Sequence, residues 1–174
     1  TASPQFSLST SGILNCYDPE AELQASVLGS GNFTFGWTDQ QQVQISDELA
    51  FSTTQSGWYT FTAQNVDNGC IAGDSIELQA DFSPAQAAAQ AENSGLLTCD
   101  FPSLTLSAQG SAPAGGINYS WQTPAGQPLG NMSDLSVNTA GDYVLVVQNQ
   151  QSGCRDTLSM PVTIDQSPPT VAIA

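Results

Sequence analysis

The sequence predicts an all-β protein of two tandem β-sandwich repeats, because its two halves match and both consist of short alternating runs. Sliding the 174-residue sequence against itself by 84 residues superposes aromatic and cysteine positions of the two halves: Trp37 on Trp121, Tyr59 on Tyr143, and Cys70 on Cys154. A shift of 83 residues aligns Cys16 with Cys99. A one-residue change of offset is typical of an insertion in a loop, so each half is one copy of the same fold.

Each repeat contains runs in which apolar residues alternate with polar or small ones, the pattern of half-buried strands. The clearest runs surround the tryptophans, at residues 33–37 and 117–121. Breaks rich in Gly, Asn and Asp separate the runs. About seven strands fit in one repeat, which is the pattern of an immunoglobulin-like sandwich. We expect four aromatic residues in the two cores: Trp37, Tyr59, Trp121 and Tyr143.

A Ser-Pro pair occurs three times, each time where a repeat is expected to begin: Ser3-Pro4, Ser83-Pro84 and Ser167-Pro168. We therefore expect repeat 1 over residues 1–82, repeat 2 over residues 83–166, and the first strand of a following repeat over residues 167–174. The sequence is expected to be an excerpt of a longer array. Residues 84–92 have high helix propensity, with Ser83 as an N-cap, but we favour an extended segment over a short helix there.

The charge balance excludes two classes of partner. The chain has sixteen Asp and Glu residues, no Lys or His, and a single basic residue, Arg155, which gives a formal net charge of −15. Binding to nucleic acid or to an anionic membrane surface needs clustered Lys and Arg, so neither is expected. The longest apolar runs, such as residues 143–147, have the length of a strand and are too short to insert into a membrane.

The four cysteines fall two per repeat at matching positions, and three pairings are possible. We expect one disulfide within each repeat, Cys16–Cys70 and Cys99–Cys154. Each bond would close a loop of about 55 residues and stabilise its repeat by roughly 4 kcal/mol on the chain-entropy model. A zinc site of four thiolates is the alternative, but it lacks the paired C-x2-C spacing that zinc prefers. Disulfides predict an extracellular or cell-surface location, because the cytosol is reducing.

Several strings of the second repeat carry a resemblance to a known family: Leu97–Cys99 (Leu-Thr-Cys), Tyr119–Trp121 (Tyr-Ser-Trp), Ala140–Tyr143, Gly153-Cys154, and Asp165–Pro169. In this order they resemble Ig-like and PKD-like repeats of large surface and secreted proteins of Bacteroidota, and the first repeat resembles them more loosely. The resemblance implies a spacer or building unit of adhesins, stalks or fibres that are exported by type IX secretion.

The position of the tyrosines differs from that in classical immunoglobulin domains, where the tyrosine lies two residues before the second cysteine. Here Tyr59 and Tyr143 precede Cys70 and Cys154 by eleven residues. We therefore expect each disulfide to tie a strand entrance to a hairpin, and not to pin the two sheets together beside the tryptophan. This departure does not favour antibody-like or receptor-like binding.

The sequence has few of the residue types that act in catalysis, so no enzymatic activity and no cofactor are expected. There is no His or Lys to act as a base, and the cysteines are expected to be oxidised. Asp18, Glu20 and Glu22 alternate and would share one face of a strand, where they could bind calcium or hydrolyse a glycoside. A solvated acidic edge that discourages strand pairing is the favoured interpretation, and no metal site is expected.

Trp58 is a candidate contact residue, because alternation with Tyr59 points it outward. The aligned residue of the second repeat is Asp142. An exposed tryptophan can cover the flank of its own repeat, contact another chain, or stack on a sugar. The glutamine-rich stretch Gln40–Gln44 is the second candidate contact.

Two short strings resemble the Asp-Ser/Thr-aliphatic acceptor of O-glycosylation in Bacteroidota. They are Asp74-Ser75-Ile76 and Asp156-Thr157-Leu158, at similar places in the two repeats. Ser75 and Thr157 are therefore candidate modification sites.

Together these observations predict a structural repeat of a large extracellular surface protein, as an adhesin, a stalk or a multi-chain fibre. The expected partners are neighbouring repeats of the same polypeptide, with assembly into a homo-oligomeric fibre as a further hypothesis. The alternative is a carbohydrate- or surface-binding Ig-like module that binds a surface glycan. That alternative requires an aromatic-lined groove, which one repeat can possess without the other.

Overall fold

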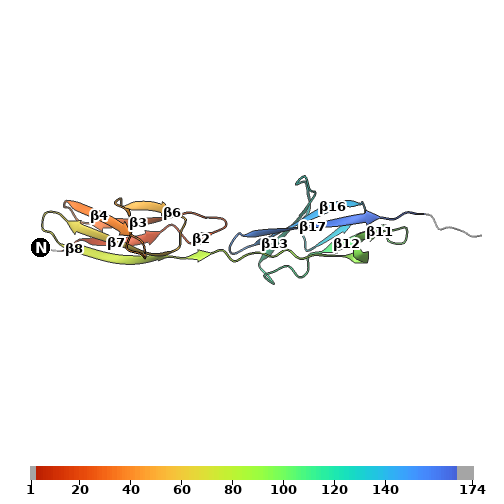
Figure 1. Ribbon diagram of the computed structural model, residues 1–174, viewed down its shortest axis with the longest axis horizontal. Coiled ribbons are helices and arrows are strands. Elements are labelled where there is room, and N and C mark those ends of the chain that lie inside the picture. Colours follow the sequence, from red (N-terminus) through yellow and green to blue (C-terminus); the bar gives the residue numbers. More distant parts are fainter. Residues whose placement is uncertain (1–2, 168–174) are drawn as a thin grey trace, which may run out of the picture. The chain divides into compact units, whose positions relative to one another are not determined.

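The computed structural model describes residues 3–167, and its chain divides into two compact units, Thr1–Phe82 and Ser83–Ala174 (Figure 1). Both units are built almost entirely of strands, which confirms the predicted all-β fold of tandem immunoglobulin-like sandwiches. Apart from Ser167, the expected strand over residues 167–174 lies outside the described residues.

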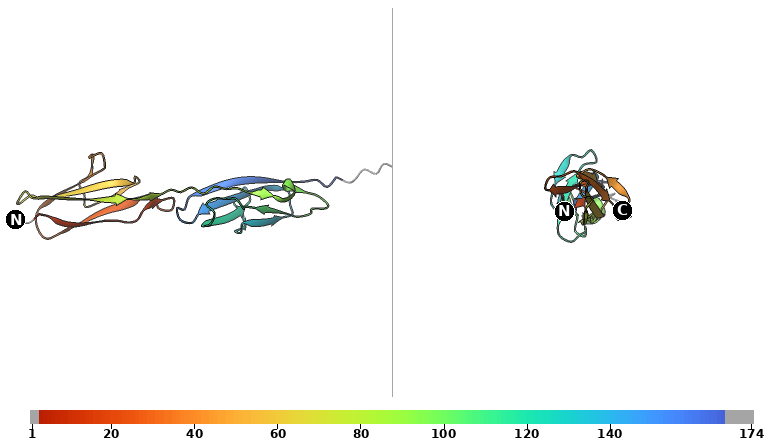
Figure 2. Two further views of the ribbon diagram at one scale, coloured as in Figure 1. Left: turned by 90° about the horizontal axis from the view of Figure 1, so that it is seen from below. Right: turned by 90° about the vertical axis from the view of Figure 1, so that its left-hand side faces the viewer.

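The first unit, repeat 1, is a sandwich of a three-stranded and a four-stranded sheet, with the sheet orders β1-β3-β6 and β5-β4-β7-β8. A short parallel pair, β2-β9, completes it. The strands are β1 (Gln5–Thr10), β2 (Leu14–Asn15), β3 (Ala21–Leu28), β4 (Phe33–Thr38), β5 (Gln44–Ser46), β6 (Ala50–Thr53), β7 (Gly57–Asn65), β8 (Ile71–Leu78) and β9 (Ala80–Asp81). Figure 2 shows the two layers of strands.

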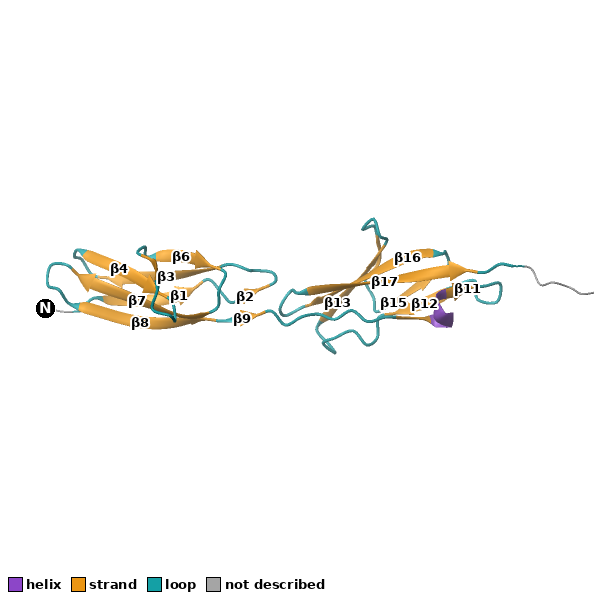
Figure 3. Ribbon diagram, viewed as in Figure 1, coloured by secondary structure: helices purple, strands orange, loops and turns teal. Residues whose placement is uncertain are grey.

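The second unit, repeat 2, has the same plan, with the sheet orders β10-β12-β15 and β11-β17-β16-β13-β14. Here the parallel pair, β11-β17, is part of the larger sheet. The elements, coloured by type in Figure 3, are β10 (Gln90–Ala91), the 3-10 helix η1 (Glu92–Gly95), β11 (Leu96–Leu97), β12 (Leu104–Ser107), β13 (Ile117–Gln122), β14 (Pro128–Gly130), β15 (Asp134–Val137), β16 (Gly141–Asn149) and β17 (Arg155–Ile164).

The alternation of apolar residues directs one face of each strand into the core. Trp37 on β4 and Trp121 on β13 are fully buried, and Tyr59 and Tyr143 are buried as well. In repeat 1 the tryptophan packs against Phe61, with ring centroids 5.0 Å apart. Repeat 2 has aliphatic residues around its tryptophan, so the two cores keep one plan with different packing.

Both tyrosines anchor the turn that precedes their strand. The Tyr59 hydroxyl donates to the carbonyl of Gln55 at 2.7 Å, and the Tyr143 hydroxyl donates to the carbonyl of Thr139 at 2.9 Å. A hydroxyl that bonds backbone a few residues upstream is the tyrosine corner of immunoglobulin-like sandwiches. The tyrosine therefore keeps this role although the cysteine lies eleven residues further on.

Residues 84–91 are extended rather than helical, and only Glu92 of the expected segment belongs to a helix, the short η1, because tertiary hydrogen bonds outweigh the helix propensity of this segment. Gln86 exchanges two backbone hydrogen bonds with Ala112, at 2.9 and 3.0 Å. The Ala87 N–H donates to a carboxylate oxygen of Asp156 on β17 at 2.8 Å. This bond and one from the Thr157 N–H lower the pKa of Asp156 below its ordinary value of 3.8.

The two core tryptophans differ in one hydrogen bond, which gives a matched pair of variants. Trp121 Nε1 donates to the carbonyl of Met132 at 3.1 Å, whereas buried Trp37 Nε1 has no partner among the described residues. Trp121→Phe should lower the stability of repeat 2 by about 1 kcal/mol more than Trp37→Phe lowers that of repeat 1. Native-state hydrogen exchange of the β7 amides in repeat 1 and of the β16 amides in repeat 2 measures the two losses of stability. Equal losses would contradict the assignment of a hydrogen bond to Trp121 and of none to Trp37.

Acid should release the Ala87 amide from Asp156. Because the folded pKa of Asp156 lies below 3.8, the bond is fully present above that pH and is lost as the pH falls through the lower, folded value. The amide shift of Ala87, followed by NMR, should titrate with a midpoint below 3.8. In Asp156→Asn the same shift should not titrate. A midpoint above 3.8 in the parent chain would show that the hydrogen bond does not favour the carboxylate.

Candidate functional site: the cysteine-bearing ends of each repeat

The first cysteine of each repeat lies at the end from which the chain leaves that repeat. In repeat 1, Asn15 of β2 pairs with Asp81 at the end of β9, and Cys16 follows. In repeat 2, Leu97 of β11 pairs with Ile164 at the end of β17, and Cys99 lies two residues later. We call Cys16 and Cys99 the exit cysteines.

The same turn carries both exit cysteines. The Asn15 N–H donates to the carbonyl of Asp18 at 2.9 Å, and the Thr98 N–H donates to the carbonyl of Phe101 at 3.0 Å. The Asn15 and Thr98 side chains accept N–H groups of their own turns at 2.8 and 3.1 Å. The exit cysteine therefore lies in the same type of hydrogen-bonded turn in both repeats.

The second cysteine lies at the opposite end, in the hairpin turn before the last long strand. Cys70 and Cys154 directly precede β8 and β17, and their carbonyls accept the N–H groups of Asn65 and Asn149, each at 2.9 Å. In repeat 1 this is the end where β1 begins, because Gln5 pairs with Leu28 and Phe33 pairs with Asn65.

In repeat 2 the same hairpin turn holds the incoming chain. The carbonyl of Ser83 accepts a hydrogen bond from the Asn149 side chain at 3.2 Å and one from the Ser152 hydroxyl at 2.6 Å. Asn149 and Ser152 are both buried. We call Cys70 and Cys154 the entry cysteines.

This placement overturns the predicted pairing within each repeat. The two ends of repeat 1 are separated by residues 71–81, in β8 and β9. These residues form about 30 Å of extended chain. A disulfide requires the two Cα atoms to lie within about 7 Å of each other. The pairs Cys16–Cys70 and Cys99–Cys154 therefore cannot form while the strands are intact. The matching spacings in the sequence showed that the cysteines of the two repeats are equivalent. They did not show that the two cysteines of one repeat lie at opposite ends of that repeat.

Cys16 and Cys154 are disulfide-bonded in the structure, while Cys70 and Cys99 are free thiols. The predicted bonds Cys16–Cys70 and Cys99–Cys154 are therefore both wrong, because one cysteine of each predicted pair is free. The expectation that each disulfide ties a strand entrance to a hairpin of its own repeat is wrong for the same reason.

The acidic residues near Cys16 do not form the predicted row on one strand. Glu22 lies on β3, but Asp18 and Glu20 lie in the loop before it. All three are exposed, and no group of three or more His, Cys, Asp or Glu residues within residues 3–167 is placed to hold a metal ion. Asp18 and Glu20 line an open hollow with Ser11.

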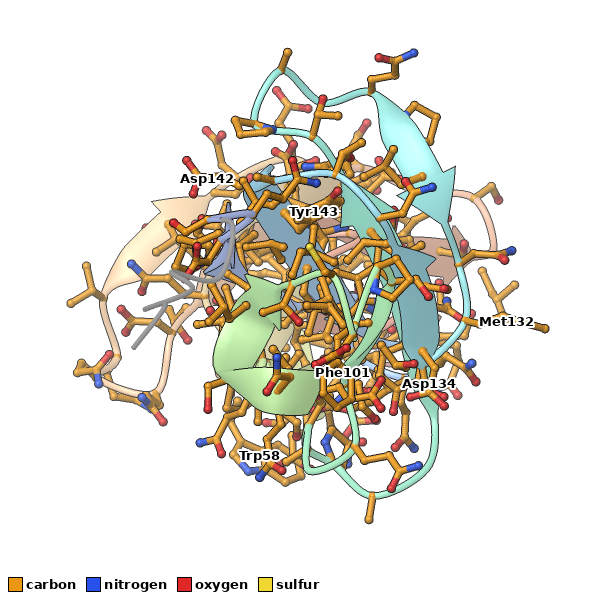
Figure 4. The ribbon with its side chains drawn as sticks, turned by 90° about the vertical axis from the view of Figure 1, so that its right-hand side faces the viewer. Trp58, Phe101, Met132, Asp134, Asp142 and Tyr143 are labelled. Atoms are coloured by element: carbon orange, nitrogen blue, oxygen red, sulfur yellow. The ribbon has the colours of Figure 1, made fainter. Side chains whose placement is uncertain are left out.

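Trp58 and the glutamine-rich turn come together on one surface of repeat 1. The Trp58 side chain is 52% exposed and lies at the periphery in Figure 4. It lines a shallow hollow with Gln40 and Gln41. The Asp39 carboxylate holds the glutamine turn by accepting the Gln41 N–H at 2.9 Å. In repeat 2 the corresponding position is Asp142, so this surface belongs to repeat 1 alone.

Both candidate glycosylation residues are exposed on strands, Ser75 on β8 and Thr157 on β17. The preceding aspartates, Asp74 and Asp156, accept the N–H of the candidate residue at 2.8 Å in each case. The Ser75 hydroxyl also bonds the Thr60 hydroxyl at 2.8 Å. Both hydroxyls face solvent, and modification at these residues stays a prediction.

A scan against protein-family models and a search of curated proteins found no match. Solved structures do match. A structure of a 1.5-MDa bacterial ice-binding adhesin is 12% identical, covers 96% of this chain and 67% of that chain, and has a TM-score of 0.55. Three N-terminal domains of the outer capsid protein Hoc of bacteriophage RB49 are 14% identical, cover 93% of this chain and 59% of that chain, and have a TM-score of 0.49.

The chain shares its fold with this part of the adhesin structure, and at 12% identity the match shows the fold alone. This chain spans 59% of the capsid-protein structure. No helix among residues 3–167 is long and apolar enough to cross a membrane.

The assignment of bonded and free cysteines can be tested on the chain itself. Alkylation of the native chain without reductant should label Cys70 and Cys99, and peptide mapping should find Cys16 and Cys154 unlabelled. Glu-C digestion suits the mapping because the chain has sixteen acidic residues and only one basic residue. Peptides that link Cys16 to Cys70, or Cys99 to Cys154, would contradict the placement of the cysteines at opposite ends.

Proposed function

We propose that this chain is a structural repeat unit of a large extracellular surface protein of the adhesin, stalk or multi-chain fibre type. The observation that carries the proposal is the repetition of one immunoglobulin-like sandwich plan. Each repeat has a three-stranded sheet opposite a larger sheet, and in each a tyrosine hydroxyl anchors the turn before one strand of the larger sheet. The disulfide-bonded cysteines, Cys16 and Cys154, support an extracellular location, where disulfides persist.

Two further observations support a structural role. The net charge of −15 disfavours nucleic acid and anionic membranes as partners. The resemblance of the second repeat to Ig-like and PKD-like repeats supports an origin in Bacteroidota and export by type IX secretion, with neighbouring repeats of the same polypeptide as the principal partners.

Single-molecule pulling in dithiothreitol tests the proposal. Held at its two ends, the chain should resist extension until each repeat unfolds in a step of its own, because each repeat has its own hydrophobic core. Extension without two discrete unfolding steps would contradict the mechanical role.

Binding of a surface glycan is the second candidate function, and the surface around Trp58 favours it. A half-exposed indole beside Gln40 and Gln41 offers a stacking face next to hydrogen-bonding amides. On a glycan array, Trp58→Ala should then abolish binding. Tyr17→Ala is a matched control, since Tyr17 is an aromatic residue of similar exposure, 51%, at the exit end. Glycan binding that survives in Trp58→Ala would exclude this surface as the binding site.

A further inference from the structure

We propose that repeat 2 binds an acidic sugar, a hexuronate unit of a polysaccharide, on the outer face of its larger sheet. The site is a hollow over the neighbouring strands β13, β16 and β17, which are labelled in Figure 1. Arg155 binds the sugar carboxylate, and the amides and hydroxyls around it bond the sugar hydroxyls. This inference goes beyond the proposed structural role and does not depend on the surface around Trp58.

The register of the three strands brings the polar side chains of the hollow together. Asn118 of β13 pairs with Gln148 of β16, and Gln148 pairs with Arg155 of β17, so these residues form a row across the sheet. Because alternate residues of a strand share a face, the row lies on the face opposite to buried Trp121. The polar residues that line the hollow are Asn118, Ser120, Gln122, Gln148, Arg155 and Thr157.

The hollow presents a positive charge that no carboxylate of its own repeat neutralises. Among residues 3–167, no Asp or Glu lines it, although the chain has sixteen acidic residues. Arg155 is exposed, and its guanidinium forms no ion pair within the described part of the chain. The carboxylate of the next residue, Asp156, accepts the N–H groups of Ala87 and Thr157 instead, each at 2.8 Å.

Hydrogen bonds around the hollow orient two of its amides. Gln150 Nε2 donates to Asn118 Oδ1 at 2.8 Å, and Gln148 Nε2 donates to the carbonyl of Gly153 at 3.0 Å. These bonds leave Asn118 Nδ2 as a donor and Gln148 Oε1 as an acceptor for a ligand. A sugar hydroxyl both donates and accepts, so a donor and an acceptor on adjacent strands suit it.

The combination of groups selects a sugar that carries a carboxylate. A guanidinium bonds a carboxylate through two parallel N–H···O hydrogen bonds. An acidic side chain of a protein would use Arg155 but would leave the surrounding amides and hydroxyls without partners. A hexuronate has a carboxylate and several hydroxyls on one ring, so it uses both. The hollow has a volume of about 420 Å³, which lies within the range of small-molecule sites.

Repeat 1 has a hollow at the equivalent place that lacks the charge. Its lining includes Gln64 and Ile71, which the offset of 84 residues aligns with Gln148 and Arg155. Its volume is about 190 Å³, smaller than that of the hollow in repeat 2. The same sheet face without the cation therefore provides a control within the chain.

An NMR titration of the whole chain with trigalacturonate tests the site, at about 0.15 M ionic strength, where charges more than about 8 Å away are screened. The amides around Gln148 and Arg155 should shift saturably, and those around Gln64 and Ile71 should not. Arg155→Gln should weaken binding about tenfold or more, because the charge-assisted hydrogen bonds are lost. Trp58→Ala and Ile71→Gln, the matched controls, should bind as the parent does.

A second measurement needs no variant. The methyl ester of trigalacturonate has the same ring hydroxyls without the carboxylate charge, so it should bind the parent chain about tenfold more weakly or worse. Equal binding of the ester, equal shifts in the two repeats, or no saturable shift would overturn the site. Triglutamate that binds as tightly as trigalacturonate would overturn the choice of a sugar. Pulling in dithiothreitol uses no ligand, so failure of this site is distinguishable from failure of the proposed structural role.

Discussion

A short parallel pairing of two strands determines where the cysteines of each repeat lie. Leu14 and Asn15 of β2 pair with Ala80 and Asp81 of β9, and the pair is repeated as β11 with β17. Because the strands are parallel, the residue that follows the first strand lies at the end from which the chain leaves the repeat. The exit cysteine is thereby kept a full strand length from the entry cysteine of the same repeat.

The carboxylates of the chain serve as hydrogen-bond acceptors for the backbone. With sixteen acidic residues and one basic residue, most carboxylates cannot be neutralised by ion pairs. Several accept hydrogen bonds from backbone N–H groups, as Asp39 does at 2.9 Å and Asp156 does at 2.8 Å. These bonds order loops and segments within a repeat.

Periodicity was sufficient to predict the sandwich and its core. The alternation around Trp37 and Trp121 fixes which face of β4 and β13 is buried, since one face of a strand packs against the opposite sheet. The outward direction of Trp58 follows from the same alternation. The acidic series Asp18, Glu20 and Glu22 could not be placed in this way, because the strand begins only at Ala21 and a loop does not keep a period of two.

The sequence by itself determined that there are two copies of one immunoglobulin-like fold, which residues form their cores, and which cysteines are equivalent. Only the tertiary structure decided that the two cysteines of one repeat cannot meet. Cysteines that match between the repeats occupy the same position in each unit, whereas a disulfide depends on the distance between two cysteines in space. The length of β8 and β9 in repeat 1, and of β17 in repeat 2, separates the cysteines of one repeat by about 30 Å.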